Sequence, residues 1–427
     1  MPEPVTQVKL GNGLIVQLKE IHTSPIISHW IWYRVGSRDE LPGKTGLSHW
    51  VEHMQFKGTR QFPPTVLDKA ISREGGTWNA FTYLDWTAYY ETLPAEKIDL
   101  ALRLESDRMT NSLFAPGEVE SERTVILSER EGSENEPLFR LSEAVQSSAF
   151  AIHPYRHEII GEKDDLLKIT RDDLYNHYRA YYLPVNAVLS IAGDFDMQAM
   201  LERVTELYSP LVSGPQPPHP AQPEPAPAEE KYITLHGPGE TTYIQVAFHA
   251  PCASDPDFFA FMVMDSLLSG PSGLSIFGGG GISNKTSRLY RALVDKELAI
   301  SVNGGFQPTI DPFLYDITLT AHPEKAPQDT IAALDAEIQW LQEKPVPEQE
   351  IARAIKQARA LFAYGSENIT SQALWLGYTE MFASYEWFTR YVENLAKVTP
   401  SDIQSIAKKY LQPDHRLVGV YLPGEGS

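Results

Sequence analysis

Cysteine is nearly absent from this sequence, since Cys252 is the one thiol among 427 residues. A single cysteine excludes an internal disulfide and any zinc cluster built on cysteines. Basic residues are also few, because 36 Lys and Arg stand against 56 Asp and Glu and give a net charge of −20. Phosphate contacts need a surplus of Lys and Arg, so we expect no nucleic-acid partner.

Long apolar runs are missing as well. Nowhere do about 18 apolar residues follow one another, so we expect no membrane span. The first residues, Met1-Pro2-Glu3-Pro4, show no basic segment followed by an apolar one, so no signal peptide is visible and we expect a cytoplasmic protein. Apolar side chains are nevertheless plentiful, at 42% hydrophobic residues, which is enough to build packed cores.

Proline is concentrated in one segment near the middle of the chain. Seven of the thirteen residues from Pro215 to Pro227 are proline. Such a stretch cannot donate a ladder of backbone hydrogen bonds and favours an extended conformation. We therefore expect a linker at residues 215–230 between two domains, residues 1–214 and residues 231–427.

The two halves end in similar segments. Lys168 to Leu174 (KITRDDL) matches Lys397 to Ile403 (KVTPSDI) at an offset of 229, and the same offset carries Tyr181 onto Tyr410. Each copy predicts an N-cap, an amphipathic helix, a proline stop and an apolar strand. A gapless match at equivalent places favours duplication over chance. Further strands are expected at residues 14–18, 26–33 and 243–249 and helices at 97–109 and 348–364, which indicates two α+β domains.

The segment His49-Trp50-Val51-Glu52-His53 has the strongest chemical signal. On a helix, positions i, i+3 and i+4 share a face, so His49, Glu52 and His53 would project together. Two imidazoles one turn apart can share a zinc ion, and a carboxylate beside them can take a proton from water. The alternative is a buried helix with two incidental histidines.

A catalytic zinc needs a third protein ligand. Glu122 and Glu129 are seven residues apart, or two helical turns, and would share a face. Their neighbourhood is rich in glutamate and could equally be a solvated acidic helix. The spacing alone does not choose among these carboxylates.

His49-x-x-Glu52-His53 resembles the inverted zinc motif of the pitrilysin-like metallopeptidases, which include insulin-degrading enzyme and the mitochondrial processing peptidase. Glu129 lies 76 residues after His53, near the spacing of that family's third ligand. Further agreements are Gly75 to Thr82 (GGTWNAFT), His153-Pro154-Tyr155 and Pro184-Val185-Asn186. The resemblance covers nearly the whole chain. It implies two homologous domains, each a mostly antiparallel sheet packed with helices.

The resemblance also implies roles for single residues. His49, His53 and Glu129 would bind one zinc ion per chain, and Glu52 would be the general base. Glu122 would support a ligand without touching the metal. Residues 78–81 would form an edge strand to which a peptide substrate adds, with Asn79 and Ala80 at the contact.

The second half departs from the family pattern. Family members that complete the site carry an Arg and a Tyr in a segment resembling Ser287 to Ile300, where this sequence has Val294 and Ile300. Neither side chain can donate a hydrogen bond to a substrate carbonyl. We therefore expect a heterodimer with a homologous subunit that supplies Arg and Tyr, although a homodimer is possible.

The sequence thus predicts a zinc endopeptidase subunit that hydrolyses peptides or unfolded segments inside a dimeric chamber. Two alternatives stay open. The first is a non-catalytic chamber or scaffold subunit, against which the intact zinc set argues. The second is a peptide-binding protein with a structural zinc, against which Glu52 argues, since a structural site needs no base. The glycine-rich segment Gly278 to Thr286 lacks the pattern of a phosphate loop.

Overall fold

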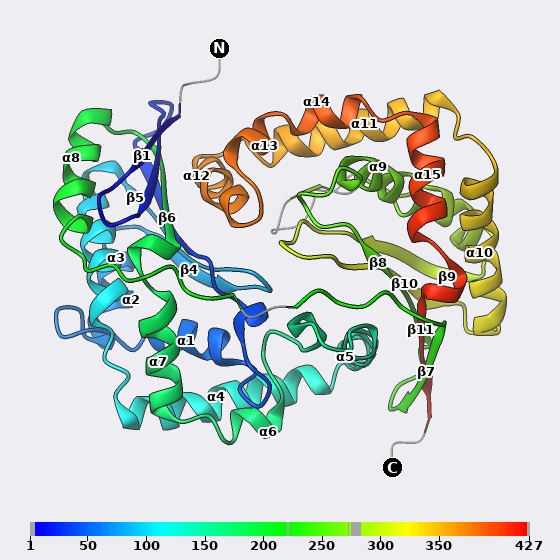
Figure 1. Ribbon diagram of the computed structural model, residues 1–427, viewed down its shortest axis with the longest axis horizontal. Helices are drawn as coiled ribbons and strands as arrows, with labels where there is room; N and C mark the ends of the chain where they lie inside the picture. The colour runs from blue at the N-terminus through cyan, green and yellow to red at the C-terminus, as the bar shows by residue number, and fades with distance from the viewer. Residues whose placement is uncertain (1–4, 220–221, 272, 275–282, 425–427) are drawn as a thin grey trace. The chain divides into compact units, whose positions relative to one another are not determined.

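The computed structural model describes residues 5–219, 222–271, 273–274 and 283–424. The glycine run Gly278 to Gly281, part of the segment that lacks the phosphate-loop pattern, lies outside the described residues. The chain forms two compact units, each built around one sheet (Figure 1). Unit 1 contains residues 1–130, 157–221 and 366–385, and unit 2 contains residues 131–156, 222–365 and 386–427.

Unit 1 has a mixed, mostly antiparallel sheet. Its strand order is β1-β2-β6-β3-β5-β4, and β2 with β6 is the parallel pair. The β-branched and aromatic runs predicted as strands lie at its centre, where β3 and β6 are buried along almost their whole length. The strands are Thr6–Lys9 (β1), Ile15–Glu20 (β2), Ile26–Tyr33 (β3), Thr77–Thr82 (β4), Thr87–Pro94 (β5) and Ala187–Gly193 (β6).

Unit 2 repeats this arrangement. Its strand order is β7-β11-β8-β10-β9, with β7 and β11 parallel and the other pairs antiparallel. Removing β1 from the first sheet leaves the same order and the same directions. The strands are Lys231–Gly237 (β7), Tyr243–Ala250 (β8), Ala299–Gly305 (β9), Phe313–Ala321 (β10) and Leu417–Pro423 (β11).

The repeat seen in the sequence is a repeated helix–strand unit. In unit 1 the helix α7 (Arg171–Tyr181) leads to β6, and in unit 2 the helix α15 (Pro400–Tyr410) leads to β11. Thr170 and Thr399 cap these helices, and each forms a reciprocal capping box with the aspartate three residues later. The α+β prediction of two homologous sheet domains is confirmed.

One helix from each half of the sequence packs on the sheet whose strands come from the other half. Helix α5 (Pro137–Ala149) from the first half lies against β8 and β11, and α12 (Ile369–Tyr378) from the second half lies against β3 and β6 (Figure 1). The units therefore differ from the expected domains 1–214 and 231–427. A sheet with two apolar faces must be covered by other elements on both. One face of the unit 1 sheet is covered by α12 from the second half of the sequence, and one face of the unit 2 sheet by α5 from the first half.

The other helices of unit 1 are α1 (Leu47–Gln55), α2 (Pro64–Arg73), α3 (Ile98–Asn111), α6 (Lys163–Leu166) and α8 (Met197–Tyr208), with most of α4 (Pro116–Glu134). Those of unit 2 are α9 (Phe258–Leu268), α10 (Pro327–Glu343), α11 (Glu348–Tyr364) and α14 (Tyr391–Ala396), and α13 is Tyr385–Thr389. In the part of the chain that is described, no helix combines the length and apolar character needed to cross a bilayer.

The proline-rich linker is anchored rather than loose at both ends. On unit 1, His219 Nδ1 lies 2.7 Å from Asp39 Oδ1. On unit 2, the Glu224 carboxylate accepts hydrogen bonds from the backbone amides of Ala151, Ile152 and His153. The linker is therefore bonded to unit 1 through His219 and to unit 2 through Glu224.

Candidate metal centre

Helix α1 is fixed in unit 1 by one apolar stripe. Leu47, Trp50, Val51 and Met54 follow the i, i+3, i+4, i+7 spacing and are buried in the core of the unit. This packing turns the neighbouring face, with His49, Glu52 and His53, toward the edge strand β4 and the helix α4. The predicted helix over the motif is present.

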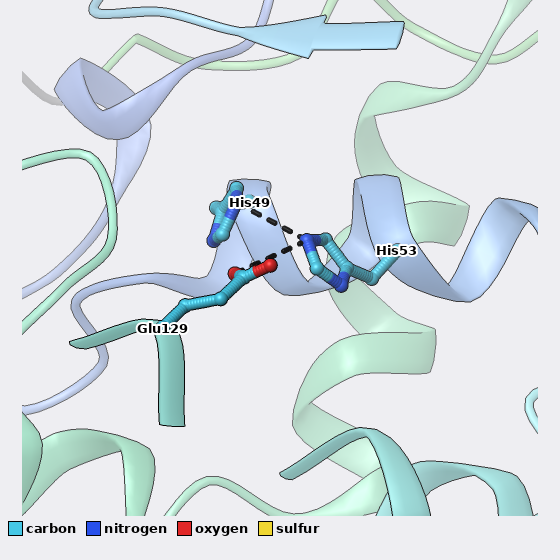
Figure 2. Close-up of side chains that lie close together, drawn as sticks. All are labelled: His49, His53 and Glu129. Carbon is cyan, nitrogen blue, oxygen red and sulfur yellow. Dashed lines mark hydrogen bonds and ion pairs between the residues drawn. The ribbon is translucent and has the colours of Figure 1, made fainter. Parts of the chain in front are cut away.

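His49, His53 and Glu129 come together in the structure (Figure 2). His49 Nε2 and His53 Nε2 are 3.2 Å apart, and Glu129 Oε2 is 3.7 Å from His53 Nε2. Two nitrogens that each lie about 2.0–2.1 Å from a tetrahedral zinc are separated by roughly 3.3 Å. The two imidazole nitrogens therefore have the spacing that one zinc ion requires.

The surroundings of both imidazoles suit metal binding. Burial lowers the pKa of His49 to about 3, so its ring is neutral and keeps a lone pair. His53 Nδ1 lies 2.8 Å from Glu122 Oε1, and this contact makes Nδ1 the protonated nitrogen and leaves the Nε2 lone pair directed at His49. The donor set thus fits a zinc ion with an accessible side, because the Glu129 side chain is 46% exposed.

Carboxylates around His53 favour a cation in this position. Burial acts to lower the pKa of His53, but the hydrogen bond to Glu122 and the charges of Glu129 and Glu52 raise it above its ordinary value. Burial acts to raise the pKa of Glu122, while its bonds to His53 and Lys57 lower it. Glu122 is therefore a carboxylate that binds one imidazole and one ammonium group.

Glu52 is buried beside the two histidines, with 8% of the residue exposed. Its Oε2 accepts a hydrogen bond of 2.6 Å from the hydroxyl of Thr82 at the end of β4. Burial raises the pKa of Glu52, and the Thr82 hydroxyl acts in the opposite direction. A raised pKa makes a carboxylate a better proton acceptor, as a general base requires.

Two residues of this site were missed at the level of sequence. Thr82 lies two residues after Ala80, so the strand period places both on one face, and that face carries the Thr82 hydroxyl toward Glu52. Lys57 lies four residues after His53, just past the end of α1. The sequence spacing of Thr82 from Ala80 and of Lys57 from His53 could have indicated both residues. Neither threonine nor lysine suggests metal chemistry by itself.

The expected substrate-binding residues lie on β4, which is the edge of its sheet. The Asn79 side chain is exposed, whereas Ala80 is 7% exposed. The Ala80 amide donates to Asn79 Oδ1 over 2.9 Å, so this backbone donor is satisfied by the neighbouring side chain rather than left bare. Val294 ends a π-helical turn, and Ile300 on β9 is 56% exposed.

Family models match both halves of the chain. The model described as Insulinase (Peptidase family M16) matches residues 15–163, and the model described as Peptidase M16 inactive domain matches residues 168–358. The chain belongs to peptidase family M16. The M16 match in the first half contains His49, Glu52, His53 and Glu129.

Relatives of similar length support the M16 assignment. An uncharacterized zinc protease of Streptomyces coelicolor is 26% identical over 97% of this chain and 89% of its own length. The mitochondrial-processing peptidase subunit beta of Lentinula edodes is 27% identical over 96% of this chain and 88% of its own. Among solved structures, a protease from Helicobacter pylori has a TM-score of 0.92 at 23% identity and covers 99% of this chain and 100% of that one, which shows the shared fold.

Proposed function

We propose that this chain is the zinc-bearing subunit of an endopeptidase, with one zinc ion held by His49, His53 and Glu129. The observation that carries the proposal is the convergence of two imidazole nitrogens, 3.2 Å apart, with a carboxylate of another helix. Relatives named zinc proteases give independent support. Bound zinc would supply a Lewis acid that polarises the water and the scissile carbonyl.

Glu52 would be the general base. It lies about one turn after His49 and directly before His53 on α1, and the Thr82 hydroxyl directs its carboxylate. As water attacks the peptide carbonyl, Glu52 takes the proton of the water and then delivers it to the leaving nitrogen. Asn79 and Ala80 would hold the peptide as an added strand along β4, where main-chain hydrogen bonds give a grip that tolerates many sequences.

The second half supports a requirement for a partner. The side chains of Val294 and Ile300 cannot donate hydrogen bonds, and a lost donor to a developing oxyanion often costs about 2.7–4 kcal/mol of transition-state stabilisation. A homologous subunit with Arg and Tyr at these positions would complete the site in a heterodimeric chamber. A homodimer would contain two zinc sites and no copy of this pair.

The zinc assignment is tested by metal analysis of His49→Ala. The variant should lose zinc, whereas His22→Ala, which removes an exposed histidine bonded to Asp194 and Glu20, should keep it. Retention of zinc at full stoichiometry in His49→Ala would overturn the ligand set. The same analysis of the wild-type chain counts the ions per chain.

The base is tested by Glu52→Gln, which keeps the size of the side chain but removes the proton acceptor. Zinc should stay bound while peptide hydrolysis falls by about 10²–10⁴-fold. Hydrolysis at the wild-type rate would place the base elsewhere. If neither protein cleaves any peptide, alone or with a co-expressed homologous subunit, the chain is a non-catalytic subunit.

The partner requirement is tested by peptide turnover of the isolated chain and of reconstituted mixtures. Activity should appear or rise sharply in the mixture. The double variant Val294→Arg with Ile300→Tyr should raise the activity of the isolated chain. An isolated wild-type chain as fast as any mixture would end the partner hypothesis.

A further inference from the structure

The N-terminus of α1 has no cap of its own. Its N-cap residue is Gly46, which adopts a left-handed backbone conformation with φ of +87° and has no side chain to accept hydrogen bonds. A Cβ at this position would lie 2.6 Å from the carbonyl oxygen of Ile160. A capping side chain at position 46 is therefore excluded sterically, although the amides of the first helical turn still need acceptors.

Glu40 supplies the missing acceptors from outside the helix. Its Oε2 accepts a hydrogen bond of 2.7 Å from the Gly46 amide, and its Oε1 accepts one of 2.7 Å from the Ser48 amide. His49, the first residue of the metal motif, follows Ser48 directly. Glu40 thus binds the end of α1 that carries His49, while Glu122 binds His53 at the other end.

Glu40 itself belongs to a short turn, Gly36 to Glu40, that is tied to the β4–β5 hairpin. The amides of Ser37 and Arg38 donate to the carbonyls of Tyr83 and Leu84, over 3.2 and 2.8 Å. These carbonyls follow Thr82, whose hydroxyl donates to Glu52. The turn therefore joins the helix that carries the metal motif to the strand that directs the base.

A second contact holds the same two parts together. The Ser48 hydroxyl donates to the Gly36 carbonyl over 2.9 Å and lies 3.2 Å from His177 Nε2.

Glu40 is 2% exposed, and burial raises its pKa to about 8 while the Ser48 and Gly46 amides act to lower it. A carboxyl group is costly in such a place unless hydrogen-bond donors face it, and the two backbone amides at the start of α1 provide them.

We propose that Glu40 is a positioning residue of the metal centre, which sets the axial position and rotation of α1 relative to β4 so that His49 and Glu52 meet the zinc ion and the substrate strand. This inference rests on the proposed zinc peptidase function. It assigns Glu40 no contact with metal or substrate. Its effect on catalysis is transmitted through two backbone amides.

Two variants separate this role from general stability. Glu40→Leu removes both acceptors at similar volume, and Glu40→Gln keeps one acceptor oxygen. Ile403→Val, in the core of unit 2 at 0% exposure, serves as a control that lowers stability without touching α1. The temperature of each measurement is set at the same distance below the Tm of each variant.

The first readout is hydrogen–deuterium exchange in zinc-free protein. Amides of residues 46–50 should exchange faster in Glu40→Leu than in Glu40→Gln, and faster in both than in wild type, while α15 is unchanged. The second is the zinc Kd from competition with a chromophoric chelator, which should weaken roughly 10-fold in Glu40→Leu, since loss of a helix cap is worth about 0.5–2 kcal/mol. The third is peptide turnover, in which kcat should fall and KM should stay constant.

These measurements distinguish failure of the Glu40 role from failure of the proposed zinc peptidase function. Wild-type zinc affinity and α1 exchange in Glu40→Leu would overturn the role of Glu40 while leaving the zinc site intact. An equal loss of zinc affinity in Ile403→Val would reduce Glu40 to a stabilising residue and also overturn it. A wild-type chain that binds no zinc would overturn the proposed function first, and the metal-positioning role of Glu40 with it.

Discussion

Helices α1 and α9 occupy equivalent places in the two units and have opposite characters. Each is the first long helix after its central strand, β3 or β8, and each packs against an edge strand, β4 or β9. Helix α1 carries His49, Glu52 and His53 beside its apolar stripe, whereas α9 (FFAFMVMDSLL) is buried almost all round and has Asp265 as its one ionisable residue. The same position in the fold can therefore carry polar side chains suited to binding a metal or only apolar side chains that pack.

The difference between the units lies in side chains, not in topology. The one cluster of potential metal ligands found among the described residues belongs to unit 1. Unit 2 repeats the strand order around α9 without it. In both units the fold places a helix against an edge strand, and in the described part of the chain only the polar residues on α1 give one of these places the ligands for a metal.

The largest expected effect comes from separating the halves. Residues 1–214 lack α12 and residues 231–427 lack α5, so each sheet would expose the face that the exchanged helix buries. Each half expressed alone should lose its whole folding free energy, about 5–15 kcal/mol for a native domain. Circular dichroism melts check this, and co-expression of both halves should restore a cooperative transition. A single half that melts like the full chain would show that the exchange is dispensable.

The contact of α12 with the unit 1 sheet should tolerate an added methyl group less well than the contact of α5 with the unit 2 sheet. A Cβ on Gly377 of α12 would lie 2.1 Å from Trp32 Nε1, whereas one on Gly419 of β11 would lie 2.6 Å from a Val145 methyl group. A buried indole yields less than a methyl group, so Gly377→Ala should cost about 3 kcal/mol and Gly419→Ala about 1 kcal/mol. Denaturant titration measures both.

A matched control for this pair is Gly132→Ala in α4, where a Cβ would have no neighbour within 4 Å. This variant should be neutral or stabilising, by up to about 1 kcal/mol, since alanine is the better helix former. Equal losses at Gly377 and Gly419 would contradict the idea that the Trp32 ring makes the contact in unit 1 more rigid.

A third expected difference concerns pH. His177 on α7 corresponds to Ile406 on α15 at the offset of 229, and both are buried. Burial lowers the pKa of His177 to about 4, so between pH 6.5 and 4 the unfolded chain takes up a proton that the folded chain does not. The neutral, buried His177 therefore contributes to the free energy of unfolding above pH 6.5. This contribution is lost as the pH falls, by about 2 kcal/mol at pH 5.

His177→Ile, which copies the residue of unit 2, should therefore flatten the decline in the free energy of unfolding between pH 7.5 and 5. Denaturant titrations at several pH values measure the slope. His22→Gln is the control, because the hydrogen bonds to Asp194 and Glu20 raise the pKa of this exposed histidine and its removal cannot flatten the same decline. An unchanged slope in His177→Ile would assign the acid sensitivity to other groups.

The smallest expected effect is on the orientation of Glu52. Thr82→Val keeps the shape of the side chain but removes the hydroxyl that donates to Glu52. A typical intramolecular hydrogen bond contributes about 0.5–1.5 kcal/mol net, so kcat should fall by up to roughly 10-fold with zinc retained. Thr320→Val removes a comparable hydroxyl, bonded to Ser301 in unit 2, and should leave kcat unchanged. A similar loss of kcat in both variants would point to stability alone.

Much of the local structure could be predicted from sequence. The strands at β3 and β8, the helix over the metal motif and the repeated helix–strand unit each follow from periodicity, capping residues and proline within a few neighbouring positions. The family assignment predicted from His49-x-x-Glu52-His53 and Glu129 is confirmed. The roles of these residues, and of Asn79 and Ala80, remain predictions for the experiments above.

The sequence by itself determined that His49, Glu52 and His53 share one helix face, because 3.6 residues per turn fix that relation wherever the helix lies. It also determined that two similar halves follow one another, because the repeat is written in the chain. Only the tertiary structure decided that Glu129 lies beside the two histidines, that Thr82 bonds to Glu52 and Glu40 to the start of α1, and that α5 and α12 cover the sheet of the opposite half. Apart from the bonds of Glu40 to Gly46 and Ser48, these relations depend on contacts between residues about 30 or more positions apart. No local pattern specifies which distant surface a helix will cover.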